Sequence, residues 1–114
     1  MKKVIINENQ RGLLFAGGRY RKFLTPGKYH IYGDWEIETL CTDRALRSAR
    51  CTLDTLLLDS AIAKQVSVVE VADQQLALHF INGRFEQVLC QGKYAFWAIH
   101  DRHDYQIIDI SQTE

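Results

Sequence analysis

The chain has 114 residues, 46% hydrophobic and 25% charged, a composition typical of one folded domain. Fourteen basic and fourteen acidic residues cancel, so bulk charge indicates neither a nucleic-acid nor a membrane partner. No apolar run approaches the roughly 18 residues of a membrane span, and the start of the chain turns polar too early for a signal peptide. Three cysteines without CxxC spacing argue against a secreted disulfide framework, so a cytoplasmic protein is predicted.

The first 41 residues carry the signals of a small antiparallel β-meander. Residues 3–6 (KVII) are mostly β-branched and predict a strand, and Gly17-Gly18 after an apolar run predicts a two-residue hairpin turn. Proline then glycine at residues 26–27 suits a type II turn, and the apolar residues of 28–31 alternate as in a half-buried strand. Residues 35–41 are expected to close the meander as its last strand.

A connector of about residues 42–65 breaks the β pattern. Thr52 is a plausible N-cap, and leucines and isoleucine follow at spacings of three and four. These features predict an amphipathic helix over residues 53–64, broken near Asp59-Ser60, after a weaker helical or irregular stretch over residues 42–50. The connector has no Gly, Pro or Ser-rich tract, so it is expected to pack on the sheets.

The rest of the chain repeats the first part. Residues 66–71 predict a β-branched strand, and residues 75–97 align with residues 10–32 at a shift of 65 with nine of 23 positions identical. The shared frame is Gly-Arg, four residues, Leu, two residues, Gly-Lys-Tyr. A further slip of five residues matches Trp35–Leu40 with Tyr105–Ile110. We infer an internal duplication in which both copies have the same strand order.

The predicted fold class is therefore α+β, mainly β: two repeated antiparallel β-meander units joined by a short amphipathic helix. The expected organisation is a single domain over residues 1–114, with β repeats at about 1–41 and 66–111 and the connector between them.

Charge is divided unevenly between the repeats. Residues 1–30 hold seven basic residues and one acid, and residues 31–114 hold seven basic and thirteen acidic residues. Solvent-facing strand positions explain this plainly, whereas a functional interpretation is a surface for an anionic or acidic partner. The candidate interface residues are Arg19, Arg21, Lys22, Lys28 and Arg84.

Sites for chemistry are sparse. His100-Asp101-Arg102-His103-Asp104 groups possible metal ligands, although a surface loop between strands is the simpler interpretation. Cys41, Cys51 and Cys90 lack ligand or catalytic spacing and are interpreted as small apolar side chains or free thiols. The glycine–arginine pairs precede strands rather than helices, which favours turns over phosphate loops, and the aromatic residues are interpreted as core rather than as a base-stacking platform. No catalytic residue, cofactor or metal is predicted, and a metal-dependent enzyme built on the His100 loop is the weakest alternative.

Residues Glu8–Leu40 resemble the entry segment of the stomatin/prohibitin/flotillin (band 7, SPFH) superfamily. The resemblance is carried by Glu8 with Gly12, Gly18-Arg19, Pro26-Gly27 and the strand ending Thr39-Leu40. With the duplicated residues 53–97 and Ile108-Asp109-Ile110, the whole chain is similar to the N-terminal region of a subgroup of bacterial slipins. The resemblance fits either an N-terminal fragment of a longer slipin or a free-standing relative of that region. The ending Asp109–Glu114 resembles a point where the family's chain runs on, which favours the fragment.

The resemblance implies a non-enzymatic, membrane-associated scaffold that forms homo-oligomers. The expected function is a non-catalytic slipin-like protein-interaction and assembly domain, with self-association and with membrane association through parts outside this chain. The expected location is the cytoplasm, including the inner face of the membrane. The alternative is an anion-binding module that engages nucleic acid or acidic lipid headgroups through the basic first repeat, although no nucleic-acid partner is expected on balance. Contiguous exposed Arg and Lys would favour the anion binder, whereas an exposed apolar patch or an unpaired strand edge would favour assembly.

Overall fold

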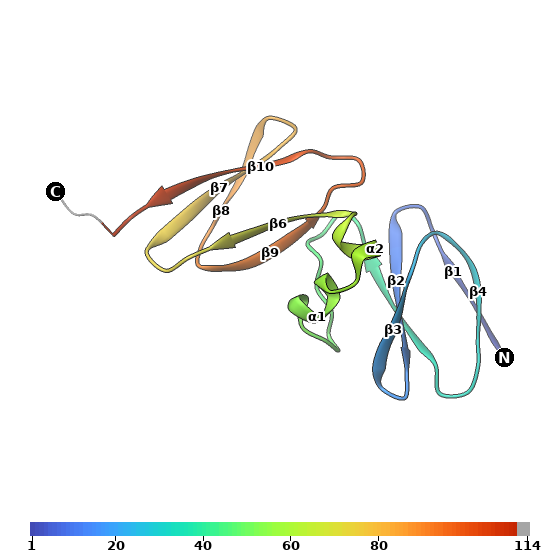
Figure 1. Ribbon diagram of the computed structural model, residues 1–114. Coiled ribbons are helices and arrows are strands. Elements are labelled where there is room, and N and C mark those ends of the chain that lie inside the picture. The colour runs from blue at the N-terminus through green and yellow to red at the C-terminus, as the bar shows by residue number, and fades with distance from the viewer. Residues whose placement is uncertain (112–114) are drawn as a thin grey trace. The chain divides into compact units, whose positions relative to one another are not determined.

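The computed structural model describes residues 1–111, in which strands predominate and two short helices lie at the middle of the chain (Figure 1). The chain divides into two compact units, unit 1 (Met1–Lys64) and unit 2 (Gln65–Glu114). The elements of unit 1 are β1 (Lys2–Ile6), β2 (Gln10–Ala16), β3 (Arg19–Leu24), β4 (Gly27–Ile31), β5 (Glu36–Cys41), α1 (Leu53–Leu57) and α2 (Ser60–Ala63). Those of unit 2 are β6 (Val66–Val71), β7 (Gln75–Ile81), β8 (Arg84–Leu89), β9 (Gly92–Trp97) and β10 (His103–Asp109).

Both units have the same antiparallel topology. Unit 1 consists of a two-stranded sheet, β1-β4, and a three-stranded sheet in the order β3-β2-β5. Unit 2 repeats this as β6-β9 and β10-β7-β8. The registers also agree at the shift of 65, since Leu13 pairs with Phe23 and Leu78 pairs with Val88. The mainly β fold class and the repeated strand order are thus confirmed.

The strand order within each repeat is not that of a meander. The hairpin β2-β3 is followed by β4, which pairs with β1 in the other sheet, and β5 returns to pair with β2. Two small sheets allow each repeat to bury apolar side chains between them, whereas a single meander of this length would leave more apolar surface exposed.

The second sequence match is offset by two residues from the structural equivalence. Ile37 pairs with Leu14, and Tyr105 pairs with His79, the residue equivalent to Leu14. Equivalent positions in β5 and β10 are therefore 68 apart, a slip of three residues rather than five. The sequence match of Trp35 with Tyr105 is based on similar side chains. The pairing of each strand with its neighbour defines the structural equivalence instead, and by that pairing His103 is the equivalent of Trp35.

The tight turns are those that the sequence predicts. Gly17-Gly18 and Asn82-Gly83 form two-residue hairpin loops with positive φ at all four residues. These are the angles of a type I′ turn, in which a side chain with a branched Cβ would be strained. Both hairpins also contain a bulge after the second residue pair, a shared irregularity that supports the duplication.

The repeated Gly-Lys-Tyr motif has a structural basis. The Tyr29 hydroxyl donates to the Thr25 carbonyl, and the Tyr94 hydroxyl donates to the Cys90 carbonyl at 3.0 Å. In each copy the ring lies over the glycine two residues earlier, with ring atoms about 3.5 to 3.8 Å from where a Cβ would be. Gly27 has φ 155°, not the roughly +80° of the expected type II turn, because the chain is already extended there to enter β4.

Each unit has its core between its two sheets. In unit 1 a Cβ on Gly12 would come within 3.0 Å of the Ile6 side chain, so the sheets approach closely at this glycine. In unit 2 the equivalent Ala77 is fully buried, and the core around it comprises Val69, Val71, Ala77, Leu89 and Phe96. We name the side of each three-stranded sheet that carries Gly12 or Ala77 its inner face, and the opposite side its outer face.

The connector is short and irregular, and its helix is broken as expected. Residues 42–50 form no helix, and Thr52 caps α1 by accepting from the Thr55 amide. Helix α1 ends at its C-cap residue Leu58, and the Asp59 side chain then caps α2 by accepting from the Ala61 amide. Leu46, Leu56 and Ile62 are each buried, so the connector has an apolar side that packs within unit 1.

Candidate functional site

The outer face of unit 1 is covered by the connector. Its residues are Arg11, Leu13 and Phe15 of β2, Tyr20 and Phe23 of β3, and Glu36, Glu38 and Leu40 of β5. Leu13, Phe15 and Phe23 are buried, and in Figure 1 α1 and α2 lie beside the three-stranded sheet.

Polar contacts fix the connector in place on this face. The Tyr20 hydroxyl donates to the Asp59 carboxylate at 2.7 Å, so one carboxylate both caps α2 and binds the sheet. Burial and the adjacent Asp59 raise the pKa of Tyr20 well above its ordinary value. Glu38 accepts hydrogen bonds from Ser48 and from the Ala49 amide. The connector is therefore held through specific donors and acceptors as well as through apolar contact.

Arg50 of the connector also contacts the outer face of unit 1. Its guanidinium lies 5.3 Å from the centre of the Phe15 ring and forms a 2.8 Å ion pair with Glu36. This ion pair lowers the pKa of Glu36. Both partners are substantially exposed, so the pair contributes little to stability compared with the apolar contact beneath it.

The equivalent outer face of unit 2 is apolar and exposed. Leu78 and Phe80 of β7 replace Leu13 and Phe15, and they are only half-buried. On β8, Phe85 is 57% exposed and Val88 is 49% exposed. The complete apolar set is Leu76, Leu78, Phe80, Phe85, Val88 and Ile108, which lie on three adjacent strands. We call these six residues the bare face.

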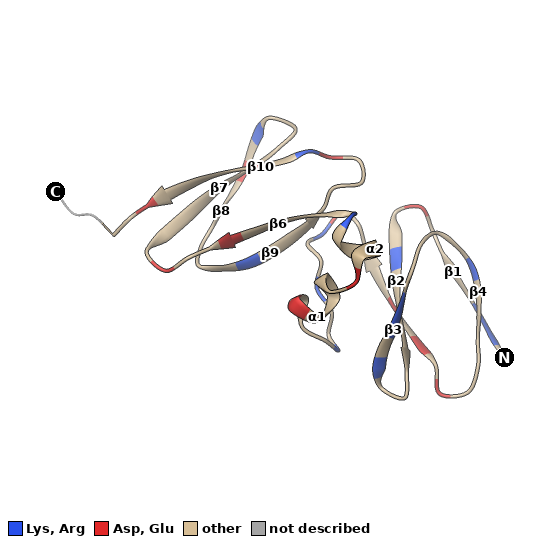
Figure 2. Cartoon of the chain, in the orientation of Figure 1, with Lys and Arg blue, Asp and Glu red and all other residues tan. Residues whose placement is uncertain are grey.

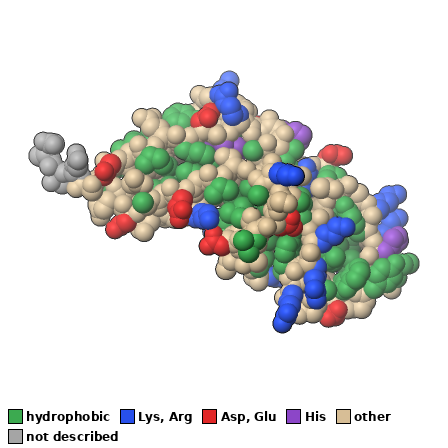
Figure 3. Space-filling model, in the orientation of Figure 1, with side chains coloured by type: hydrophobic (Ala, Val, Ile, Leu, Met, Phe, Trp, Pro, Cys, Tyr) green, Lys and Arg blue, Asp and Glu red, His purple; other side chains and the backbone are tan. Residues whose placement is uncertain are grey.

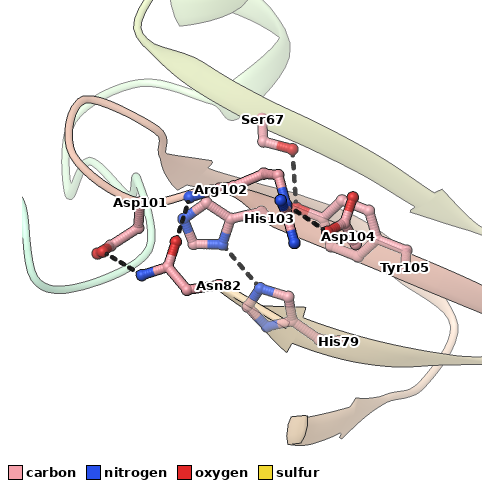
Figure 4. A network of polar contacts seen from close by, with 8 residues as sticks. All are labelled: Ser67, His79, Asn82, Asp101, Arg102, His103, Asp104 and Tyr105. Atoms are coloured by element: carbon pink, nitrogen blue, oxygen red, sulfur yellow. Dashed lines mark hydrogen bonds and ion pairs between the residues drawn. The ribbon is translucent and has the colours of Figure 1, made fainter. Parts of the chain in front are cut away.

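The inner face of unit 2 contains a chain of polar side chains (Figure 4). His79 is fully buried, and its Nε2 lies 2.8 Å from Nδ1 of His103. Gln87 lies 3.2 Å from the other ring nitrogen of His79, and Nε2 of His103 lies 2.9 Å from the Trp97 carbonyl. The His79 ring also stacks on Phe96 at 4.2 Å between ring centres.

When both rings are in their neutral form, the hydrogen-bond order assigns their protons. The Trp97 carbonyl can only accept, so Nε2 of His103 carries a hydrogen and its Nδ1 accepts from Nε2 of His79. Nδ1 of His79 then accepts from the Gln87 amide. Burial, and next the nearby His103, lower the pKa of His79. All four ring nitrogens of His79 and His103 thus have hydrogen-bond partners.

The acidic and histidine-rich segment 100–104 is only partly a loop. His100, Asp101 and Arg102 lie in the loop, but His103 and Asp104 belong to β10, and His103 points into the unit. Asn82 bonds both the Asp101 carboxylate and the Arg102 amide, and Arg102 pairs with Asp104 at 2.9 Å (Figure 4). Within residues 1–111 no group of three or more potential ligands is arranged to hold a metal ion. The interpretation of the whole segment as a surface loop was thus wrong for His103.

The predicted basic interface residues are all exposed, but they do not share one strand. Arg19, Arg21 and Lys22 lie on β3, Lys28 lies on β4 in the other sheet of unit 1, and Arg84 lies on β8 of unit 2 (Figure 2). Arg19 and Arg84 occupy equivalent places directly after the hairpin turns. In the space-filling view, basic side chains project from unit 1 between hydrophobic ones (Figure 3).

Among residues 1–111 the cysteines form no pair and no cluster with other potential metal ligands. Cys41 and Cys90 are exposed and Cys51 is half-buried, and all three are free thiols. In the described chain no helix has the length and apolar character needed to cross a bilayer.

Comparison with protein-family models, curated proteins and solved structures finds no match to this chain. The resemblance to slipins therefore stays a prediction, and the functional argument depends on the surfaces described above.

Proposed function

We propose that this chain is a non-catalytic protein-interaction and assembly domain. The observation that carries the proposal is the bare face of unit 2, where three neighbouring strands contribute six apolar side chains, three of them exposed and three half-buried. Contiguous apolar surface of this kind is costly to expose to water and commonly marks a binding site for another protein. The slipin resemblance points to the same class of function and adds homo-oligomers as the expected product.

Charge provides a second contribution to assembly. The basic residues of β3 and the acidic excess of residues 31–114 would attract each other between copies of the chain. A head-to-tail contact of this kind joins two different surfaces, so it propagates into a ring or a filament. Such association is expected to be weak and to weaken further with salt, because the screening length is about 8 Å at 0.15 M.

Sedimentation velocity of the full chain tests the proposal. We expect concentration-dependent association at low salt that is reduced by Val88→Asp on the bare face or by the charge reversal Arg21→Glu with Lys22→Glu. Val68→Asp is the matched control, because Val68 has a similar exposure of 43% but lies in the other sheet of unit 2. A strict monomer at high protein concentration and low salt would contradict self-assembly.

A second candidate function is favoured by the three exposed cations of β3. An anion-binding module would use Arg19, Arg21 and Lys22 to contact phosphate groups of acidic lipid headgroups. Flotation with vesicles containing phosphatidylserine distinguishes the two functions: binding that is lost in the Arg21→Glu, Lys22→Glu variant and kept in Val88→Asp would favour the anion binder.

A further inference from the structure

We infer that the bare face of unit 2 is a docking site for a short, amphipathic helical segment of a partner chain, similar in chemistry to the connector of unit 1. This inference rests on the proposed function and names the kind of partner. The internal duplication provides the argument, because it supplies two versions of the same surface within one molecule. In unit 1 that surface, the outer face of the three-stranded sheet, is covered by the connector.

The two outer faces share their central apolar side chains. Leu13 and Leu78 are equivalent, as are Phe15 and Phe80, and Tyr20 is matched by the aromatic Phe85. The rings of Phe15 and Tyr20 meet edge to face at 6.0 Å, and those of Phe80 and Phe85 do so at 5.9 Å. An apolar segment that fits the first surface therefore meets nearly the same contour on the second.

The occupant of the first surface defines the anchors that a partner needs. Leu56 of α1 and Ile62 of α2 have no exposed surface, and Leu46 is 4% exposed. Leu56 and Ile62 belong to two helices of about one turn each, whereas Leu46 lies in the irregular stretch before them. Asp54, Thr55 and Ser60 are polar residues exposed on these helices. Short amphipathic helices that present leucine or isoleucine to an apolar surface are a recurrent form of protein recognition.

The differences between the faces indicate how the partner should differ from the connector. Phe85 lacks the hydroxyl with which Tyr20 binds Asp59, and neutral Gln106 replaces Glu38. Asp104 replaces Glu36 and is already paired with Arg102 of its own unit. The bare face thus offers fewer polar and charged partners than the outer face of unit 1, so a ligand needs fewer charged groups to bind it. Binding is expected to depend on apolar anchors and to change little with salt.

A sheet-on-sheet pairing of two bare faces in a dimer is the main competing occupant. The duplication favours the helical segment, because the equivalent outer face of unit 1 is covered by the helices of the connector and not by a second sheet. The two occupants are separated by experiment, since a helical peptide titrates as a ligand and a second copy changes the sedimentation coefficient.

The test uses the full chain, labelled with ¹⁵N, and a synthetic peptide of residues 42–64 with Cys51→Ser. We expect the amide signals of β7 and β8 to shift in a saturable manner, and those of β2 and β3 to stay in place because that face is occupied. The matched control peptide carries Leu56→Asp and Ile62→Asp, which remove both fully buried anchors, and it should bind at least about tenfold more weakly, a loss of about 1.4 kcal/mol.

Protein variants locate the site. Val88→Asp should weaken peptide binding at least about tenfold, whereas Val68→Asp in the other sheet of unit 2 should leave it unchanged. Raising the salt concentration should change the affinity less than about twofold, in contrast with the charge-driven self-association.

Three results would overturn the inference. They are shifts confined to β2 and β3, equal binding of both peptides, or no shift at a peptide concentration of about 1 mM. If the peptide fails but sedimentation shows dimers that Val88→Asp abolishes, a second copy occupies the bare face and the proposed function stands. If the peptide fails and the chain is a strict monomer in which Val88→Asp changes nothing, the proposed function falls as well.

Discussion

Unit 1 has packed side chains on both faces of its three-stranded sheet, whereas unit 2 has them on the inner face and exposes apolar side chains on the outer one. The backbone frame is the same, with matching strand order, hairpin turns and bulge positions. The two units differ after the fifth strand of each repeat. Unit 1 continues there into the connector with α1 and α2, whereas in unit 2 β10 is the last element of the described chain.

The inner faces also diverged. Unit 1 places Leu14 and Ile37 opposite each other, while unit 2 places His79 and Tyr105 at the same positions. Unit 2 therefore replaces an aliphatic pair with a buried histidine and a half-buried tyrosine, and buried polar groups need hydrogen-bond partners. The two repeats thus have different side chains on their inner faces but keep the same glycine turns and strand registers.

The largest effect we predict comes from truncating the same leucine in both repeats. Leu13→Ala should lower the free energy of unfolding by about 3 kcal/mol, because Leu13 is fully buried beneath the connector. Leu78→Ala, at the equivalent position, should cost only about 1 kcal/mol because Leu78 is partly open to solvent. Urea denaturation of both variants measures the difference. Equal costs would mean that the bare face is covered in solution.

The sequence revealed the repeat because glycine has local requirements. Gly17-Gly18 and Asn82-Gly83 are needed for positive φ, and the Tyr of each Gly-Lys-Tyr packs on its own glycine, so these features survive in the primary structure. The pairing of β4 with β1 could not be predicted in this way, since it depends on which sheet the chain enters after residue 26.

The candidate surfaces were harder to predict than the strands. His79 and His103 are 24 residues apart, and only the register of β7 with β10 brings their rings together. The slip of five residues taken from the sequence assigned Trp35 to Tyr105 and so concealed that His103 occupies an inward position. The bare face did leave a signal, because Leu78 and Phe80 align with residues that are core in the first repeat. Helical periodicity alone could not show which face the connector covers.

The second prediction separates the two histidines of the 100–104 segment. His103→Ala should cost about 2 kcal/mol, because it leaves the buried Nε2 of His79 without an acceptor. His100→Ala should change stability by no more than about 0.5 kcal/mol, because His100 is an exposed loop residue. Thermal unfolding of the two single variants tests this contrast, and an equally small effect of both would show that the histidine pair contributes nothing.

A third, smaller effect concerns the hydroxyl by which unit 1 holds its connector. Tyr20→Phe should cost about 1 kcal/mol, because Asp59 loses a hydrogen bond between the sheet and α2. The reciprocal change Phe85→Tyr should leave stability within about 0.5 kcal/mol, because Phe85 is exposed. Comparison of the two variants by urea denaturation sharpens the contrast between an occupied face and an exposed one. If Tyr20→Phe is neutral, apolar packing alone retains the connector.

The smallest expected effect is a pH dependence specific to unit 2. Burial lowers the pKa of His79 in the folded protein below the roughly 6.5 of an unfolded chain. In the interval between those two pKa values the unfolded state binds more protons, so the free energy of unfolding should fall as pH drops through 6.5 and level off below the folded pKa. The neutral hydrogen-bond order gives the structural reason, because two protonated rings would place hydrogens on both facing nitrogens.

The variant that tests this contribution is His79→Leu, which installs the residue found at the equivalent position of unit 1. The change also removes the His79–His103 hydrogen bond, so the slopes against pH are compared and not the absolute stabilities. It removes the titrating group and leaves the exposed His30 and His100 in place, so their contributions are the same in both proteins. We expect the variant to have a shallower slope of unfolding free energy against pH between about pH 7.5 and 5.5. The measurement is a series of urea denaturation curves at each pH. Parallel slopes for the two proteins would show that His79 titrates alike in the folded and unfolded states, and that its burial adds no acid sensitivity to the protein.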